Sequence, residues 1–189
     1  YDTDLFTPII DKIAEISGVK YEGQMAFKVI ADHVRTVTFA LSDGAIFANE
    51  GRGYVLRRVL RRACKYAKKL GINRPFMASL VDVVLEVMGK FYPYLYENIT
   101  LVKDMITKEE SKFLQTLANG EARLSDMLSK SNGVLAGKDA FQLYDTYGFP
   151  IELTIEYAEE AGATVDVDGF KAAMDEQKRR ARESRKSLN

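Results

Sequence analysis

The side chains best suited to chemistry with a partner are cations, and they are concentrated in one stretch of the sequence. Between Gly51 and Val81 there are nine lysines and arginines and no aspartate or glutamate. The rest of the chain holds 18 cations and 27 acids, so the net charge of zero hides a strong asymmetry. Such a segment indicates an anionic partner, nucleic acid or phosphate, or an acidic surface of the protein itself. A merely solvated helix face is the other interpretation, although charges of mixed sign usually serve solubility.

A complete active site within the chain is not expected. One cysteine, Cys64, and one histidine, His33, allow neither an internal disulfide nor a zinc site built from Cys and His. Both lie in helical patterns, and we interpret them as structural residues. No nucleotide-binding glycine loop, metalloprotease motif or nucleophile elbow occurs in the sequence. The carboxylate pair Glu109-Glu110 has lysines nearby and is interpreted as a solvated helix face.

The elements that position the cations are helices, because apolar residues recur at helical spacing along nearly the whole chain. The helix with most of the cations is expected at about residues 53–70, and its apolar stripe is Val55, Leu56, Val59, Leu60, Ala63 and Ala67. Other helices are expected at about residues 7–17, 24–41, 75–88, 98–129, 150–162 and 168–187, and a short one from about 138 leads into a turn at 145–150. The predicted fold class is therefore all-α, an irregular multi-helix bundle with a long protruding C-terminal helix at 168–189. Its candidate division is into two helical lobes, 1–90 and 91–167.

Length and composition agree with a globular protein. The chain has 189 residues, of which 47% are hydrophobic and 29% charged. No stretch approaches the about 20 apolar residues of a membrane span. The single cysteine is typical of a reducing compartment, so we expect a cytoplasmic protein. Because the sequence begins with Tyr1 and not Met, we also expect it to be a piece of a longer protein.

Several segments are more specific than a generic helix pattern. The longest reads Asn-Glu-Gly-Arg-Gly-Tyr-Val-Leu-Arg-Arg-Val-Leu-Arg-Arg-Ala at 49–63, and the others lie at 1–6, 30–39, 42–44, 141–150 and 170–182. In this order and spacing they resemble the helical tRNA-recognition segment of alanyl-tRNA synthetases. The resemblance covers essentially the whole chain.

The resemblance carries implications for cofactors and partners. In that family a class II catalytic core, which binds ATP and alanine, precedes the helical segment, and the editing domain with its zinc follows it. The resemblance therefore implies that ATP with Mg, and zinc, belong to other parts of the parent. It also implies that this chain binds no cofactor and is inactive alone as a ligase. The implied partners are the acceptor stem of tRNA(Ala) and the parent's own catalytic and editing domains, with no membrane and no DNA.

The family selects its tRNA by a G·U wobble at the third base pair of the acceptor stem, read from the minor groove by one Asn and one Asp. By motif match these are Asn49 and Asp145. The guanine 2-amino group of the wobble pair lacks a base partner, which suits a carboxylate that only accepts hydrogen bonds. An amide can donate to the uracil O2. The minor groove of A-form RNA is wide and shallow, so short side chains can reach it.

The basic helix would then contact acceptor-stem phosphates and fix the position of the RNA while the two other side chains read the base pair. The candidate contacts are Arg52, Arg57, Arg58, Arg61, Arg62, Lys65 and Lys69. Some of these must pair with acids of neighbouring helices. Two pairs at i, i+4 spacing, Arg57 with Arg61 and Arg58 with Arg62, each share a face, and the sequence leaves open which pair faces RNA.

A basic helix also suggests two other classes of protein. The main alternative is a helical protein–protein adaptor whose basic face docks an acidic partner, which predicts weak RNA binding that is blind to sequence. A helix-turn-helix DNA-binding protein is disfavoured, because no compact tri-helical unit with a short recognition turn is evident.

Overall fold

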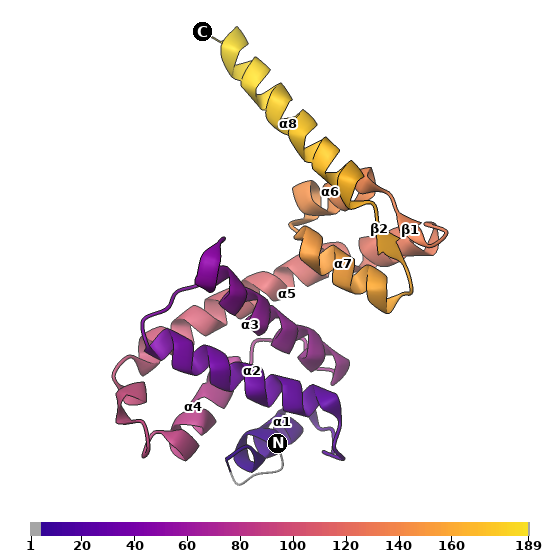
Figure 1. Ribbon diagram of the computed structural model, residues 1–189. Coiled ribbons are helices and arrows are strands. Elements are labelled where there is room, and N and C mark those ends of the chain that lie inside the picture. Colours follow the sequence, from indigo (N-terminus) through magenta and orange to yellow (C-terminus); the bar gives the residue numbers. More distant parts are fainter. Residues whose placement is uncertain (1–4, 189) are drawn as a thin grey trace. The chain divides into compact units, whose positions relative to one another are not determined.

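The computed structural model describes residues 5–188, and the chain forms two compact units within it (Figure 1). Unit 1 comprises Tyr1–Leu114 and unit 2 comprises Gln115–Asn189. The boundary falls inside the long helix α5 (Ile99–Ser129), which contributes to both units. Side chains in the first half of α5 contact residues earlier in the chain that also belong to unit 1. A division into lobes that fold independently stays a prediction.

Unit 1 is built around α2 (Met25–Ser42). This helix packs against α1 (Thr7–Ser17), α3 (Gly51–Lys69), α4 (Met77–Met88) and the 3₁₀ turn η1 (Pro93–Tyr96), as Figure 1 shows for α2 and α3. Phe27, Ile30 and Val34 of α2 are completely buried. They recur at i, i+3 and i+7, which places them on one side of the helix, and burial of such an apolar stripe is the main source of helix stability in a folded protein.

Unit 2 combines helices with a very short sheet. After α5 come β1 (Val134–Leu135), α6 (Gly137–Tyr147), α7 (Ile151–Glu160), β2 (Thr164–Val165) and α8 (Val167–Ser187). The two strands pair in parallel, with Val134 opposite Thr164 and Leu135 opposite Val165. They are the only strands in residues 5–188, so the all-α prediction is confirmed.

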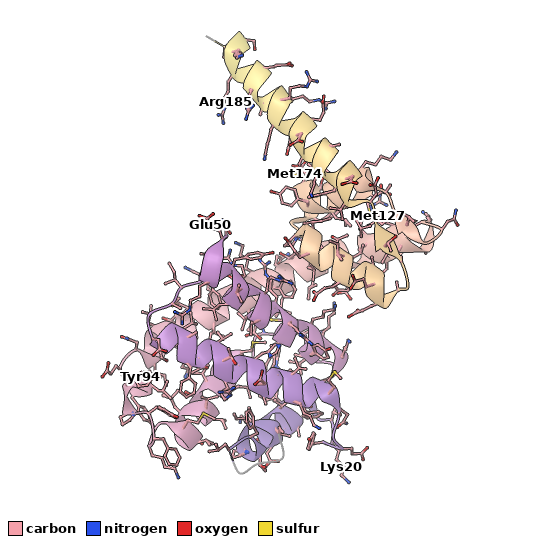
Figure 2. The ribbon with its side chains drawn as sticks, in the orientation of Figure 1. Lys20, Glu50, Tyr94, Met127, Met174 and Arg185 are labelled. Carbon is pink, nitrogen blue, oxygen red and sulfur yellow. The ribbon has the colours of Figure 1, made fainter. Side chains whose placement is uncertain are left out.

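The first turns of α8 are fixed against α6. A Cβ at Gly137 of α6 would overlap the backbone of Gly169 and Phe170 on α8, so only glycine permits this approach. Asp166 caps α8 by accepting a hydrogen bond from the Gly169 N–H at 3.0 Å. From Lys178 onward every described residue of α8 is exposed, and Figure 2 shows Arg185 on its last turns. This agrees with the predicted protruding C-terminal helix.

No helix within residues 5–188 combines the length and the apolar character needed to cross a membrane.

Candidate nucleic-acid interface

Asn49 is carried by the loop between α2 and α3 and is exposed. The loop lies close to the first turn of α3 because Gly53 has no side chain. A Cβ there would overlap the Ile46 carbonyl oxygen and come within 2.8 Å of the Ala48 backbone nitrogen. The neighbouring Glu50 is also exposed and projects at the beginning of α3 in Figure 2. The Gly-Arg-Gly sequence therefore places Asn49 at the solvent-facing end of the basic helix.

The Asn49 side chain is held by Arg57. The Arg57 Nη1 donates a hydrogen bond of 2.6 Å to Asn49 Oδ1. The Arg57 Nε lies 2.8 Å from Glu109 Oε1 on α5, an ion pair in which the N–H is not aligned as a hydrogen bond. Arg61 reaches the same oxygen at 3.7 Å. Arg57 and Arg61 therefore point toward a carboxylate of the protein itself.

The interpretation of Glu109-Glu110 as a solvated face is wrong. Glu109 is 6% exposed and Glu110 is 1% exposed. Glu109 balances the arginines of α3, and Glu110 accepts hydrogen bonds from the backbone N–H groups of Phe76 and Met77. The lysines near this pair in the sequence lie on other sides of α5, so sequence neighbours were a misleading guide.

The remaining cations of α3 divide by exposure. Arg58, Arg62 and Lys69 are exposed on one side of the helix, and we call these three the basic face. Aromatic rings lie under them: Arg58 over Tyr54 with 6.0 Å to the centroid, and Arg62 and Lys69 over Tyr66 at 5.6 and 4.7 Å. Arg52 is exposed in the first turn, whereas Lys65 is buried with 8% of its surface exposed.

Two residues of the apolar stripe predicted for α3 are not buried: Val59 is half-buried, and Val55 is the clearer exception. Leu56, Leu60, Ala63 and Ala67 are buried, but Val55 is 56% exposed. Val55 precedes Arg58 by three residues, so it lies on the same side of α3 as the basic face. The buried stripe of α3 is therefore narrower than the sequence predicted.

Asp145 lies in the last turn of α6 and is exposed. Gly148 ends this helix at a φ of 72°, and the following Phe149 is completely buried. The ring of Phe149 packs where α5 has Gly120, since a Cβ at that glycine would come within 2.6 Å of the ring. Gln177 of α8 donates a hydrogen bond of 2.8 Å from Nε2 to Asp145 Oδ1. The carboxylate is thus carried on a helix end, where the sequence suggested a turn.

The structure therefore brings Asn49 together with Arg57 in unit 1, and Asp145 together with Gln177 in unit 2. Sequence reasoning did not single out Gln177. Its only signal was its place in the family-like segment 170–182, because nothing local indicates that α8 packs on α6.

The chain is similar to known proteins over its whole length. The profile of one family, described as tRNA synthetases class II (A), matches residues 1–189. The chain belongs to this family.

Similarity to individual proteins narrows the assignment within the class II synthetases. The chain is 58% identical over 186 residues to the alanine–tRNA ligase of Acholeplasma laidlawii, a match that covers 98% of the chain and 22% of that protein. It is 57% identical over 198 residues to the alanine–tRNA ligase of Bacillus anthracis, which covers 100% of the chain and 22% of the relative. The resemblance to alanyl-tRNA synthetases is confirmed, and the chain spans about a fifth of the length of the curated relatives it matches.

The two other potentially reactive side chains of this synthetase chain, Cys64 and His33, lie in surroundings typical of structural residues. Cys64 is buried, which raises the pKa of its thiol, and nearby Glu110 and Glu109 raise it further. Burial also lowers the pKa of His33, against the opposing effect of its contact with Asp32 at 3.1 Å. Among the described residues, no group of three His, Cys, Asp or Glu side chains could hold a metal ion.

Proposed function

We propose that this chain is the tRNA-recognition part of an alanine–tRNA ligase, which binds the acceptor stem of tRNA(Ala) and selects its G·U third base pair. The observation that supports it best is the exposure of Asn49 and Asp145. These are the residues that the family motifs assign to base reading, in a chain 56–58% identical to alanine–tRNA ligases.

The chemistry of the two side chains suits the two bases. Asp145 offers acceptor oxygens to the guanine 2-amino group, which is unpaired in a wobble pair. Asn49 offers amide hydrogens to the uracil O2. In a G–C pair the guanine 2-amino group is already bonded to cytosine, so its hydrogen bond to the charged Asp145 is weakened. Discrimination between G·U and G–C then follows from the chemistry of this one contact.

Phosphate contacts are proposed for the exposed cations Arg52, Arg58, Arg62 and Lys69. Arg57 and Arg61 face Glu109, and Lys65 is buried, so these three are proposed to support the protein. Of the two arginine pairs, these contacts favour Arg58 and Arg62 as the pair that faces RNA. Phosphate contacts give affinity and position, whereas Asn49 and Asp145 give specificity.

The attachment of alanine is assigned to the rest of the parent protein. There the catalytic core would use ATP with Mg, and the editing domain would hold zinc, in the cytoplasm. The chain described here is expected not to charge tRNA by itself.

The test is the affinity of the 189-residue chain for an alanine-acceptor RNA hairpin whose third pair is G·U or G–C, at one fixed low salt concentration. We expect a G·U preference of about tenfold, or 1.4 kcal/mol. Asn49→Ala and Asp145→Ala should each remove it, because each deletes one base contact. Asn73→Ala and Asp175→Ala are matched controls at exposed sites and should keep it. Equal binding of both hairpins by the unmodified chain would contradict the proposal and favour a protein–protein adaptor.

A further inference from the structure

The amide of Asn49 can be presented to RNA in two ways, and its neighbour decides which. One side of a carboxamide is an acceptor oxygen and the other carries two donor hydrogens. An arginine has five donors and no acceptor, so the atom that faces Arg57 Nη1 at 2.6 Å has to be the Asn49 oxygen. The Nδ2 donors then point away from Arg57. The opposite orientation would set N–H groups against N–H groups.

Arg57 is itself held in place from a second helix. Its side chain is 13% exposed, and its Nε lies 2.8 Å from the Oε1 of Glu109, whose side chain is 7% exposed. An ion pair with so little exposure keeps the guanidinium close to its partner, since separating the charges would leave the buried Glu109 facing the more distant Arg61. The series Glu109, Arg57, Asn49 thus connects α5, α3 and the loop of unit 1.

Asp145 has an analogous neighbour in unit 2. A carboxylate only accepts hydrogen bonds, so the group of Gln177 that lies 2.8 Å from Asp145 Oδ1 has to be its NH₂. This contact occupies Oδ1 and leaves Oδ2 for a ligand. It also limits rotation of the carboxylate, because Gln177 lies on α8, which is packed against α6.

We propose that Arg57 and Gln177 are the positioning residues that set how the reading side chains present their hydrogen-bonding groups to the base pair. The inference rests on the proposed function. Arg57 turns the Asn49 donors toward the position of an acceptor, as in uracil O2, and Gln177 holds a free Asp145 oxygen for a donor, as in the guanine 2-amino group. Neither residue needs to touch the RNA for this effect.

The Arg57 test uses a double variant, because Arg57→Met alone leaves Glu109 without its close partner and risks misfolding. In Arg57→Met/Glu109→Gln both charges are removed together, and Gln keeps an acceptor oxygen for Arg61, which lies 3.7 Å from Glu109 Oε1. We expect the G·U preference over G–C to fall roughly five- to tenfold, toward unity, because the Asn49 amide then samples both orientations. Thermal unfolding of the variant checks that the chain is folded.

The Gln177 test uses substitutions at an exposed site. Gln177→Leu removes the donor and should lower the G·U preference several-fold, whereas Gln177→Arg supplies another donor-only group and should retain it. Gln115→Leu is a matched control, because Gln115 is also exposed and donates to an Asn Oδ1, that of Asn119, at 3.1 Å. It should leave the preference unchanged.

A readout without RNA separates this inference from the proposed function. ¹⁵N relaxation of the Asn49 side-chain amide in the free chain should show greater mobility in Arg57→Met/Glu109→Gln, while the amide of Asn73 is unaffected. If Asn49→Ala and Asp145→Ala abolish the G·U preference but the Arg57 and Gln177 variants keep it, the positioning inference is overturned and the proposed function stands. If Asn49→Ala and Asp145→Ala have no effect on the preference, both are overturned.

Discussion

Glu110 on α5 closes the N-terminal end of another helix, α4. A helix begins with backbone N–H groups that lack partners within the helix. No side chain within α4 caps it, and Glu110 accepts hydrogen bonds from Phe76 N–H at 3.1 Å and Met77 N–H at 3.2 Å in its place. Burial raises the pKa of Glu110 to about 7, although these two hydrogen bonds act in the opposite direction. A carboxyl group that contributes to unit 1 therefore titrates near neutral pH.

We expect this group to make stability depend on pH in an uncommon direction. The folded pKa of about 7 exceeds the unfolded value of 4.5, so the unfolded chain releases the proton first. The contribution of Glu110 to the free energy of unfolding is therefore largest below pH 4.5. It is lost as pH rises from 4.5 through 7. The loss is roughly 3 kcal/mol at 1.36 kcal/mol per pKa unit. Urea unfolding of the chain and of Glu110→Gln at a series of pH values measures it.

Glu110→Gln serves as the reference because it keeps an acceptor oxygen for the α4 N–H groups and cannot ionise. Other titrating groups, including the nearby Cys64 thiol, affect both proteins alike below pH 8. The difference between the two curves therefore isolates Glu110. Parallel curves between pH 4.5 and 8 would show that the carboxyl group does not titrate as described.

At the scale of elements, local signals predicted the helices well and tertiary partners poorly. Gly18, Gly71 and Gly162 follow helices at left-handed φ angles, because glycine tolerates this conformation. The surroundings of Glu109 depend on α3, far earlier in the chain, and no local pattern encodes them. The same limit applies to the candidate site: motifs singled out Asn49 as a candidate, but its contact with Arg57 required the structure.

The contact between α6 and α8 gives a prediction about elements. Gly137→Ala is expected to destabilise unit 2 although alanine is the better helix former. The new Cβ would lie 2.6 Å from the Gly169 Cα and still closer to other backbone atoms of α8, which cannot move without the first turn of that helix. Overpacking of this kind costs about 1–3 kcal/mol, whereas the gain in helix propensity is at most ~1 kcal/mol. Guanidinium unfolding measures the net change.

Lys171→Ala is the control for this substitution. Lys171 is an exposed residue of α8 close to the same contact, and its replacement should change stability by less than about 0.5 kcal/mol. Equal or greater stability of Gly137→Ala than of the unmodified chain would mean that the two helices can separate without cost.

At the scale of the whole molecule, positive and negative charges are equal in number but unevenly distributed along the chain. The chain carries 27 cations and 27 acids, yet the stretch with α3 has no acid. The excess of acids elsewhere disfavours an indiscriminate approach of RNA, and the basic segment favours approach to α3. The buried Glu109 of α5 faces Arg57 and Arg61 of α3, so under the proposed function the field at the RNA would come mainly from the exposed cations.

The salt dependence of RNA binding distinguishes these two groups of arginines. Arg58→Met and Arg62→Met should each reduce the slope of log K against log salt concentration by about 0.7–0.9, because each phosphate contact releases counterions. Arg61→Met is the matched control: the same residue type on the same helix, 19% exposed and 3.7 Å from Glu109 Oε1, so its slope should not change. Fluorescence titrations of the G·U hairpin between 50 and 200 mM salt, about the range where such slopes are measured, give the values. Equal losses in all three variants would place Arg61 on the RNA as well, and no loss in any would remove α3 from the RNA interface altogether.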